Sequence, residues 1–371
     1  MKKDWMIKES VLKEDDYQVK VLDAVLDKSC IVEGCAGSGK SILALVKAKQ
    51  IQKERGNDYK IIGFTKSLCG YMNSGKSYLG LHNRISDHWH WKWIRYEELD
   101  NDGNVVWVQK PYKPTADYII VDEIQDYTQA EIQEIVSATN KNFFFFGDTA
   151  QSVFNKLKKG TLRVDQIKQL VQGAQDAKEF TLFYNYRLPK PVAKFVQKIG
   201  INLPPYNDSV YKSVENEMPR VIQYNSFEEQ LKAIYQIVHN TNLKDVGIFL
   251  PTKVKVKETY DRLKALGGNY EVKYDDEENW HKSINTLDFN SENPKVMTYQ
   301  SAKGLQFETV FLPNLEDFDD FGDTRTALYV AMTRTYKNLY IMYSGKLPNI
   351  ISANVDPSLY KTKETDTIND F

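Results

Sequence analysis

Short apolar runs alternate with amphipathic stretches along most of the chain. In the first half, runs typical of buried strands lie at 30–33, 60–64, 117–121 and 143–146. Apolar residues at helical spacing predict helices at 17–28 and 42–49. The second half repeats this rhythm, with strands expected at 179–183, 219–223, 246–250, 296–299, 308–312 and 338–343 and helices at 189–199, 226–238, 253–266 and 324–333. Strands that alternate with helices predict an α/β protein with parallel sheets.

The stretch 88–110 interrupts this rhythm. It contains Trp89, Trp91, Trp93 and Trp107, and the turn-forming run 101–104 separates two segments of strand-like composition. This pattern predicts a β-hairpin inserted into the first half of the chain. Its aromatic side chains are expected either to form cross-strand pairs within the hairpin or to stack on bases and separate strands.

Length and composition fit a globular protein with two cores. The chain has 371 residues, of which 42% are hydrophobic and 27% charged. We expect one domain at 1–177 and a second at 178–371. No apolar run has the length of a membrane span, and three cysteines cannot all pair, so we expect a reduced, cytoplasmic protein without a membrane partner. The net charge of −1 means that any nucleic-acid surface is local.

The first strand runs directly into the sequence G-x-x-x-x-G-K-S at 34–41. In such a loop, backbone N–H groups cradle phosphate oxygens, a lysine reaches the β- and γ-phosphates, and a hydroxyl binds Mg²⁺. We therefore expect ATP and Mg²⁺ as cofactors. The residues expected to bind them are Gly34, Ala36, Gly37, Ser38, Gly39, Lys40 and Ser41.

Carboxylates follow the apolar run 117–121. Asp122 is expected to hold Mg²⁺ and Glu123 to polarise the attacking water, since acidic residues at the carboxyl end of a buried strand suit phosphoryl chemistry. Gln151, after the next strand, is expected to report the γ-phosphate state, and Gln18 to recognise the adenine edge. This order of elements describes a RecA-like, doubly wound domain of the P-loop NTPase class.

In the second half, arginines follow a predicted strand and a predicted helix. Arg187 and Arg334 are expected to stabilise the charge on a transferring phosphoryl group, as arginines carried on a second RecA-like domain do.

Taken together, these motifs resemble the superfamily 1 helicases of the UvrD/Rep type from residue 18 to residue 343. The motif D-E-x-Q-D lies at 122–126, G-D-x-x-Q-S at 147–152 and N-Y-R at 185–187. The resemblance implies that Tyr186 stacks on adenine and that Arg187 and Arg334 act as arginine fingers. The segments 298–308 and 329–334 resemble the fifth and sixth motifs, and imply nucleotide contacts from Gly304 and Gln306. Contacts with nucleic acid are implied for Phe64, Thr65, His82, Phe154, Gln300 and Ser301.

The chain also departs from the family pattern. Ile42 replaces an arginine that stacks on adenine, Gln306 a glutamate that contacts the ribose, and Lys156 a tryptophan that stacks on a DNA base. From the short spacing between motifs, we expect the two large accessory subdomains of full-size members to be absent or vestigial.

The resemblance implies an ATP-dependent helicase or translocase on single-stranded DNA, with 3′→5′ travel coupled to hydrolysis in the cleft between two domains. RNA remains open as the substrate. An alternative is a nucleic-acid-stimulated ATPase or a nucleotide-dependent switch that works with a protein partner, as a subunit of a larger repair or phage-defence complex.

Overall fold

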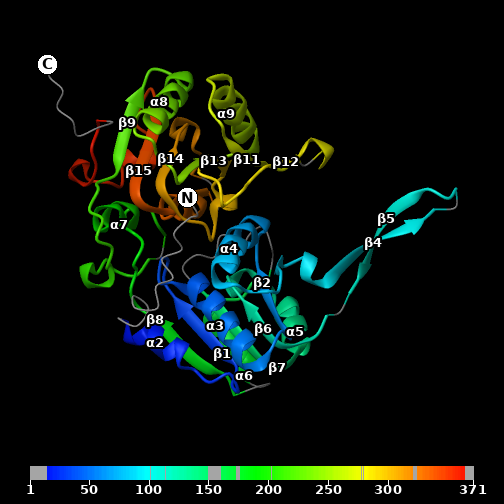
Figure 1. The fold of residues 1–371 in the computed structure, drawn as a ribbon. Coiled ribbons are helices and arrows are strands. Elements are labelled where there is room, and N and C mark those ends of the chain that lie inside the picture. The colour runs from blue at the N-terminus through cyan, green and yellow to red at the C-terminus, as the bar shows by residue number, and fades with distance from the viewer. Residues whose placement is uncertain are drawn as a thin grey trace. The chain divides into compact units, whose positions relative to one another are not determined.

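A computed structural model describes residues 15–100, 102–112, 114–148, 160–172, 176–201, 203–276, 278, 280–320 and 324–363 (Figure 1). The chain divides into two compact units. The described residues of the first unit lie within 15–34 and 39–182, and those of the second unit lie within 35–38 and 183–363.

The first unit is built on a six-stranded sheet in which every neighbouring pair is parallel. The strand order is β3-β2-β6-β7-β1-β8. The strands are β1 (Cys30–Gly34), β2 (Tyr59–Gly63), β3 (Ile85–Asp87), β6 (Ala116–Val121), β7 (Thr139–Gly147) and β8 (Lys178–Leu182). The helices are α2 (Asp16–Leu22), α3 (Lys40–Arg55), α4 (Lys66–Leu79), α5 (Gln129–Ser137) and α6 (Val164–Gln172).

Helices cover both faces of this sheet. Phe143 and Phe145 of β7 pack in a core cluster with residues of α5 and α6, whereas Phe144 lies beneath Lys47 of α3. Strands that are buried on both sides need apolar residues at every position, which explains the continuous apolar runs in the sequence.

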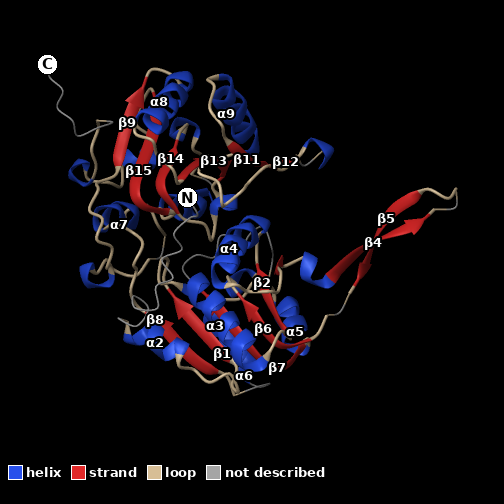
Figure 2. Ribbon diagram, viewed as in Figure 1, coloured by secondary structure: helices blue, strands red, loops and turns tan. Residues whose placement is uncertain are grey.

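A two-stranded antiparallel ribbon interrupts the first unit (Figure 2). Its strands are β4 (Trp93–Leu99) and β5 (Val105–Pro111). The Asp100 carboxylate accepts hydrogen bonds from the N–H groups of Asp102 (2.9 Å) and Asn104 (2.8 Å), which fixes the turn. The ribbon therefore lies where the sequence pattern places a hairpin.

The second unit is built on a seven-stranded sheet of order β12-β11-β13-β10-β14-β15-β9, parallel except for the pair β11–β12. The strands are β9 (Arg220–Tyr224), β10 (Val246–Leu250), β11 (Glu271–Tyr274), β12 (Ile284–Asn285), β13 (Lys295–Thr298), β14 (Phe307–Leu312) and β15 (Thr335–Ser344). The helices are α7 (Lys190–Gln197), α8 (Phe227–Asn240), α9 (Lys253–Ala265), α10 (Thr324–Met332) and α11 (Asn349–Ser352).

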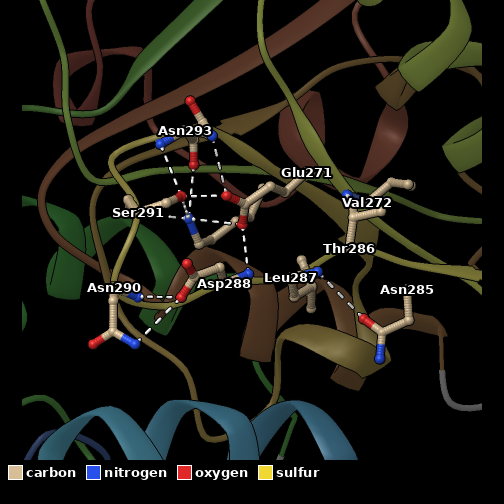
Figure 3. Close-up of polar contacts among 10 residues, drawn as sticks. Glu271, Val272, Asn285, Thr286, Leu287, Asp288, Asn290, Ser291 and Asn293 are labelled. Carbon is tan, nitrogen blue, oxygen red and sulfur yellow. Dashed lines mark hydrogen bonds and ion pairs between the residues drawn. The ribbon is translucent and has the colours of Figure 1, made fainter.

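The loop before β13 is fixed by a buried ion pair (Figure 3). Glu271 and Lys295, at the starts of β11 and β13, lie 3.2 Å apart and are 6% and 4% exposed. Glu271 accepts a hydrogen bond from the N–H of Asp288 (2.7 Å), and Lys295 donates to the Asn293 carbonyl (2.7 Å). This network holds the amino-terminal edge of the sheet.

Two predictions about elements need correction. The strand expected at 179–183, and assigned to the second half, pairs with β1 as an edge strand of the first sheet. The hydrophobic pattern gives an element's type but not its pairing partner. The helix expected at 17–28 ends at Leu22, and the short strands β3, β11 and β12 were not predicted.

Candidate functional site

The loop between β1 and α3 leaves the start of α3 open. Gly39 precedes the helix with φ +91°, and no side chain caps it, whereas Thr65 caps α4 by accepting the Leu68 N–H at 3.0 Å. The first N–H groups of a helix have no partner within the helix, and its dipole is positive there. The start of α3 is thus suited to bind an anion such as phosphate.

The Lys40 ammonium lies at the same loop. It donates a hydrogen bond to the Gly34 carbonyl at 2.7 Å and lies 3.6 Å from Asp148 Oδ2. Lys40 is 7% exposed, so its charge is directed into the loop rather than into solvent. A phosphate in the loop would find this ammonium already in place.

Ser41 joins the loop to the carboxyl end of β6. Its hydroxyl donates a hydrogen bond to Asp122 Oδ2 at 2.5 Å, although β7 lies between β1 and β6 in the sheet. Asp122 is fully buried, and this burial together with the charge of Glu123 raises the pKa of its carboxyl group. A hydroxyl and a carboxylate at this distance are oxygen ligands of the kind that Mg²⁺ prefers, so these residues fit the cation.

Glu123 adopts a strained backbone conformation beside this pair. Its φ of 58° and ψ of 43° lie in the left-handed region, which non-glycine residues rarely occupy and which often marks functional sites. The Gln125 amide donates a hydrogen bond to the Glu123 carboxylate and accepts one from the Asp148 N–H at 3.0 Å. Gly147 permits this approach, because a Cβ there would lie 3.0 Å from Gln125 Oε1.

Gln125 and Asp148 were not assigned roles from the sequence. Both belong to motifs that the sequence shows, D-E-x-Q-D and G-D-x-x-Q-S. These motifs could have indicated both residues. Only the fold shows that the Gln125 amide links the end of β6 to the end of β7.

Gln18 lies against the loop. It is 4% exposed, and a Cβ on Gly39 would approach its Nε2 to 2.9 Å. Lys47 of α3, which is 1% exposed, donates hydrogen bonds to the carbonyls of Leu22 (3.2 Å) and Ala24 (3.0 Å) at the end of α2. This buried lysine, which the sequence pattern did not single out, fixes α2 and with it Gln18.

In the second unit, the N-Y-R segment contacts the tip of the loop, which belongs to the same unit. The Tyr186 N–H donates to the Gly37 carbonyl at 3.0 Å, and Asn185 Oδ1 accepts the N–H of Arg187 at 3.0 Å. Gly37 has φ +72°, and a Cβ there would lie 2.6 Å from Asn185 Oδ1. Glycine is therefore the residue that this contact allows.

The segments that resemble the fifth and sixth motifs lie together in the second unit. Arg334 is 2% exposed, and its guanidinium donates to the carbonyls of Val330 (2.9 Å) and Leu305 (3.5 Å). Leu305 stands between Gly304, which has φ +79°, and Gln306. The structure thus brings the predicted arginine finger Arg334 close to the segment that contains Gly304 and Gln306, two predicted nucleotide contacts.

Phe64 differs from its predicted role. Its ring is 5% exposed and stacks on His88, with the ring centroids 4.5 Å apart. In this structure the ring packs in the core of the unit and has little surface open to nucleic acid, so Phe64 is not among the contacts that we propose. Thr65 is half-buried as the cap of α4, and His82 is exposed.

The remaining predicted nucleic-acid contacts are Gln300 and Ser301. Both are half-buried, and the Ser301 N–H donates to the Thr298 hydroxyl at 3.2 Å. Gln151, Phe154 and Lys156 lie outside the residues that the structure describes.

A parallel sheet in which one strand passes through G-x-x-x-x-G-K-S into an uncapped helix, beside a Ser–Asp pair, defines a P-loop protein. The chain belongs to the family of viral superfamily 1 RNA helicase core domains, whose sequence model matches residues 30–343. It is therefore a superfamily 1 helicase core.

Curated relatives match only part of the chain. A probable DNA helicase II homolog of Mycoplasma capricolum is 25% identical over 36% of this chain and 24% of its own length. The mitochondrial ATP-dependent DNA helicase HMI1 of Saccharomyces cerevisiae is 28% identical over 40% of this chain and 23% of its own length. The matches thus span about a quarter of the length of these relatives.

Solved helicases show weak similarity. The helicase of PRRSV aligns over 89% of this chain and 55% of its own, with 13% identity and a TM-score of 0.45. The C-terminal domain of a possible DNA helicase from Lactobacillus plantarum aligns over 48% of this chain and 98% of its own, with 20% identity and a TM-score of 0.36. Among the described residues, no helix is long and apolar enough to span a membrane.

Proposed function

We propose that the protein is an ATP-dependent helicase or translocase that moves along single-stranded nucleic acid, with the organisation of the UvrD/Rep type. The observation that carries this proposal is the 2.5 Å hydrogen bond between Ser41 and Asp122 beside the strained Glu123, within a superfamily 1 helicase core. Both units are proposed to be RecA-like domains.

The first unit would bind and hydrolyse the nucleotide. The uncapped start of α3 and Lys40 would bind phosphate oxygens, and Ser41 and Asp122 would hold Mg²⁺. When bound, ATP supplies the phosphoryl bond whose hydrolysis drives movement. Glu123, oriented by Gln125, would accept a proton from the attacking water. Further proposed nucleotide contacts are Gln18, Gly34, Ala36, Gly37, Ser38, Gly39, Tyr186, Gly304 and Gln306, and Gln151 is proposed to report the γ-phosphate.

Arg187 and Arg334 of the second unit are proposed to stabilise charge on the transferring phosphoryl group. Arg334 donates to carbonyls of its own unit in this structure. Acting as an arginine finger therefore requires that its guanidinium exchange these hydrogen bonds for a phosphate oxygen.

The proposed substrate is a single strand, which the exposed His82 and the half-buried Thr65, Gln300 and Ser301 are proposed to contact. The two curated relatives are named DNA helicases, and the family description names RNA helicases. We propose DNA, with 3′→5′ travel.

A second candidate function is a nucleic-acid-stimulated ATPase or ATP-dependent switch that works with a protein partner. The tip of the hairpin favours it. Leu99 and Val105 form a cross-strand pair there and are 71% and 59% exposed, and Asp100 and Asp102 lie beside them. Carboxylates repel phosphates, so this apolar, acidic tip suits a protein contact better than a nucleic-acid contact.

The two candidates are separated by measuring ATP hydrolysis and strand displacement with the purified chain. Single-stranded DNA, duplex DNA, single-stranded RNA and no nucleic acid are the four conditions, and substrates with a 3′ or a 5′ overhang test polarity. A helicase is stimulated by a single strand and displaces the paired strand from one overhang only. Stimulation without displacement supports the ATPase subunit, and ATP hydrolysis indifferent to all nucleic acids supports the switch.

A further inference from the structure

A cleft of about 440 Å³ opens at the base of the hairpin in the first unit. It lies beside β2 and β3, and Arg84, His90, Trp93 and Tyr112 are among the residues that line it. The cleft therefore combines aromatic rings with polar and basic groups. Trp93 belongs to the tryptophan-rich stretch 88–110, and none of the four belongs to a helicase motif.

Two stacked tryptophans extend from this cleft to the surface. The rings of Trp89 and Trp93 have centroids 5.3 Å apart and an interplanar angle of 20°. Trp89 is 48% exposed. One face of its indole lies on Trp93, and about half of the residue is accessible to another flat ring.

The segment that carries the tryptophans is held in place before any ligand binds. Asp87 Oδ1 accepts the N–H groups of Trp89 (3.0 Å) and His90 (2.9 Å), and His90 Nδ1 lies 2.8 Å from Asp87 Oδ2. Farther along, the Tyr112 N–H donates to the Lys92 carbonyl at 2.8 Å. A preorganised platform loses little entropy when it binds.

The charges around the cleft permit a phosphate. Arg84 is exposed, and Lys60 and His90 also line the cleft. Asp58 is the carboxylate that lines the cleft, and His90 is paired with Asp87, which is not among the lining residues. The base of the hairpin therefore differs from its acidic tip, and Arg84 is the cation best placed to meet a strand.

We propose that a nucleobase of the single strand stacks on Trp89 and that the adjoining phosphate lies at Arg84. This site rests on the proposed function and names one of its substrate contacts. It supplies a stacking platform in the unit in which Phe64, a predicted nucleic-acid contact, is buried. Any base has a flat face, so the contact favours no particular sequence.

The test is an affinity measurement with the full chain and fluorescent single-stranded DNA or RNA over a range of salt concentrations. Trp89→Ala should weaken binding by about 5- to 150-fold, the usual effect of one lost base stack, and Trp89→Phe should restore most of it. Tyr78→Ala is the matched control, since Tyr78 is 54% exposed on α4 of the same unit. The control should bind as the wild type does.

The salt dependence separates stacking from charge. Trp89→Ala should leave the slope of log affinity against log salt unchanged, and Arg84→Gln should reduce it by about 0.7, the value for one phosphate contact with a single strand. With 5-iodouracil in the strand, photo-crosslinking to the wild-type chain should map to Trp89 or Trp93. This measurement requires no variant.

Wild-type affinity for Trp89→Ala, or crosslinks that include neither Trp89 nor Trp93, would overturn the assignment of the platform. An unchanged slope for Arg84→Gln would overturn the phosphate contact. If the wild type itself binds neither DNA nor RNA, the proposed function is wrong. If the wild type binds and Trp89→Ala binds equally well, only the stacking site is wrong.

Discussion

Two helices that follow parallel strands, α3 in the first unit and α9 in the second, begin in different ways. Thr252 caps α9 by accepting the Lys255 N–H at 3.3 Å. Gly39 precedes α3 at φ +91° and offers no side-chain cap. The same strand–helix arrangement thus satisfies its own N–H groups in one unit and leaves them for an anion in the other.

The residues at the carboxyl ends of strands also differ between the two units. In the first unit, β6 ends at the buried carboxylates of Asp122 and Glu123. In the second unit, β13 ends at Thr298, whose hydroxyl accepts the Ser301 N–H at 3.2 Å. At these two strand ends, the first unit buries carboxylates, whereas the second unit uses a hydroxyl to satisfy its own backbone. The first unit is therefore where we expect nucleotide chemistry.

The largest expected effect is that of removing the ammonium at the uncapped helix. Lys40→Ala should lower ATP turnover by about 100- to 1,000-fold, the usual loss when one preorganised charge-stabilising group is removed. Steady-state phosphate release measures it. Lys53→Ala, an exposed position on the same helix, should behave as the wild type does. Equal losses in both variants would show that the effect is structural.

A smaller effect is expected from adding a methyl group at the start of α3. Gly39→Ala should raise the KM for ATP about 10-fold, because its Cβ would lie 2.9 Å from Gln18 Nε2 and a 10-fold change needs only about 1.4 kcal/mol. Gly56→Ala is the matched control. Gly56 ends the same helix at φ +92°, with nothing within 4 Å of an added Cβ. The control should lose stability, since an alanine is strained at this φ, and keep the wild-type KM.

The buried carboxyl group of Asp122 should make the stability of the protein depend on pH. Because burial raises the pKa of Asp122 above its unfolded value, the folded protein holds a proton that the unfolded chain releases, and stability falls as pH rises between these two values. Asp122→Asn should therefore raise the unfolding midpoint at pH 8 without Mg²⁺, and the gain should shrink towards pH 5.

The exposed carboxylate of Asp176 provides the control for this prediction. Its pKa is lowered by a hydrogen bond from Lys28, so Asp176→Asn should give no gain at pH 8. Thermal unfolding of the three proteins at both pH values measures the difference. A midpoint for Asp122→Asn equal to or below that of the wild type at pH 8 would contradict the assigned shift.

The smallest effect is expected at the capped helix of the second unit. Thr252→Ala should cost about 1 kcal/mol of unfolding free energy, the usual value of an N-cap, and leave ATP turnover at 25 °C unchanged. Denaturant unfolding and the phosphate assay measure the two quantities. A loss of turnover without a loss of stability would show that α9 contributes to ATP hydrolysis. It would then contradict the proposed difference between α9 and α3.

Much of the fold was predictable because buried parallel strands require unbroken apolar runs. β1, β2, β6, β7, β10 and β14 lie where such runs lie in the sequence. Pairing was not predictable, as β8 shows, because a strand at a sheet edge carries no mark of its partner. The hairpin was predictable from the turn-forming run 101–104. The Asp100 carboxylate, just before this run, accepts the hydrogen bonds that organise the turn.

At the site, the sequence identified groups but not the contacts between them. Lys40, Ser41 and Asp122 follow from a motif whose spacing has a physical reason. The link from Gln125 to Asp148 depends on two strand ends that meet only in the folded sheet. The burial of Phe64 likewise depends on His88, which lies 24 residues away and stacks on its ring.

The central claim is that the first unit hydrolyses ATP with Glu123 as the group that activates water. The most direct measurement compares ATP turnover and ATP binding in Glu123→Gln and the wild type, with and without single-stranded DNA. We predict that the variant binds ATP as the wild type does and loses turnover by about 100-fold or more. Normal hydrolysis in this variant would contradict the account.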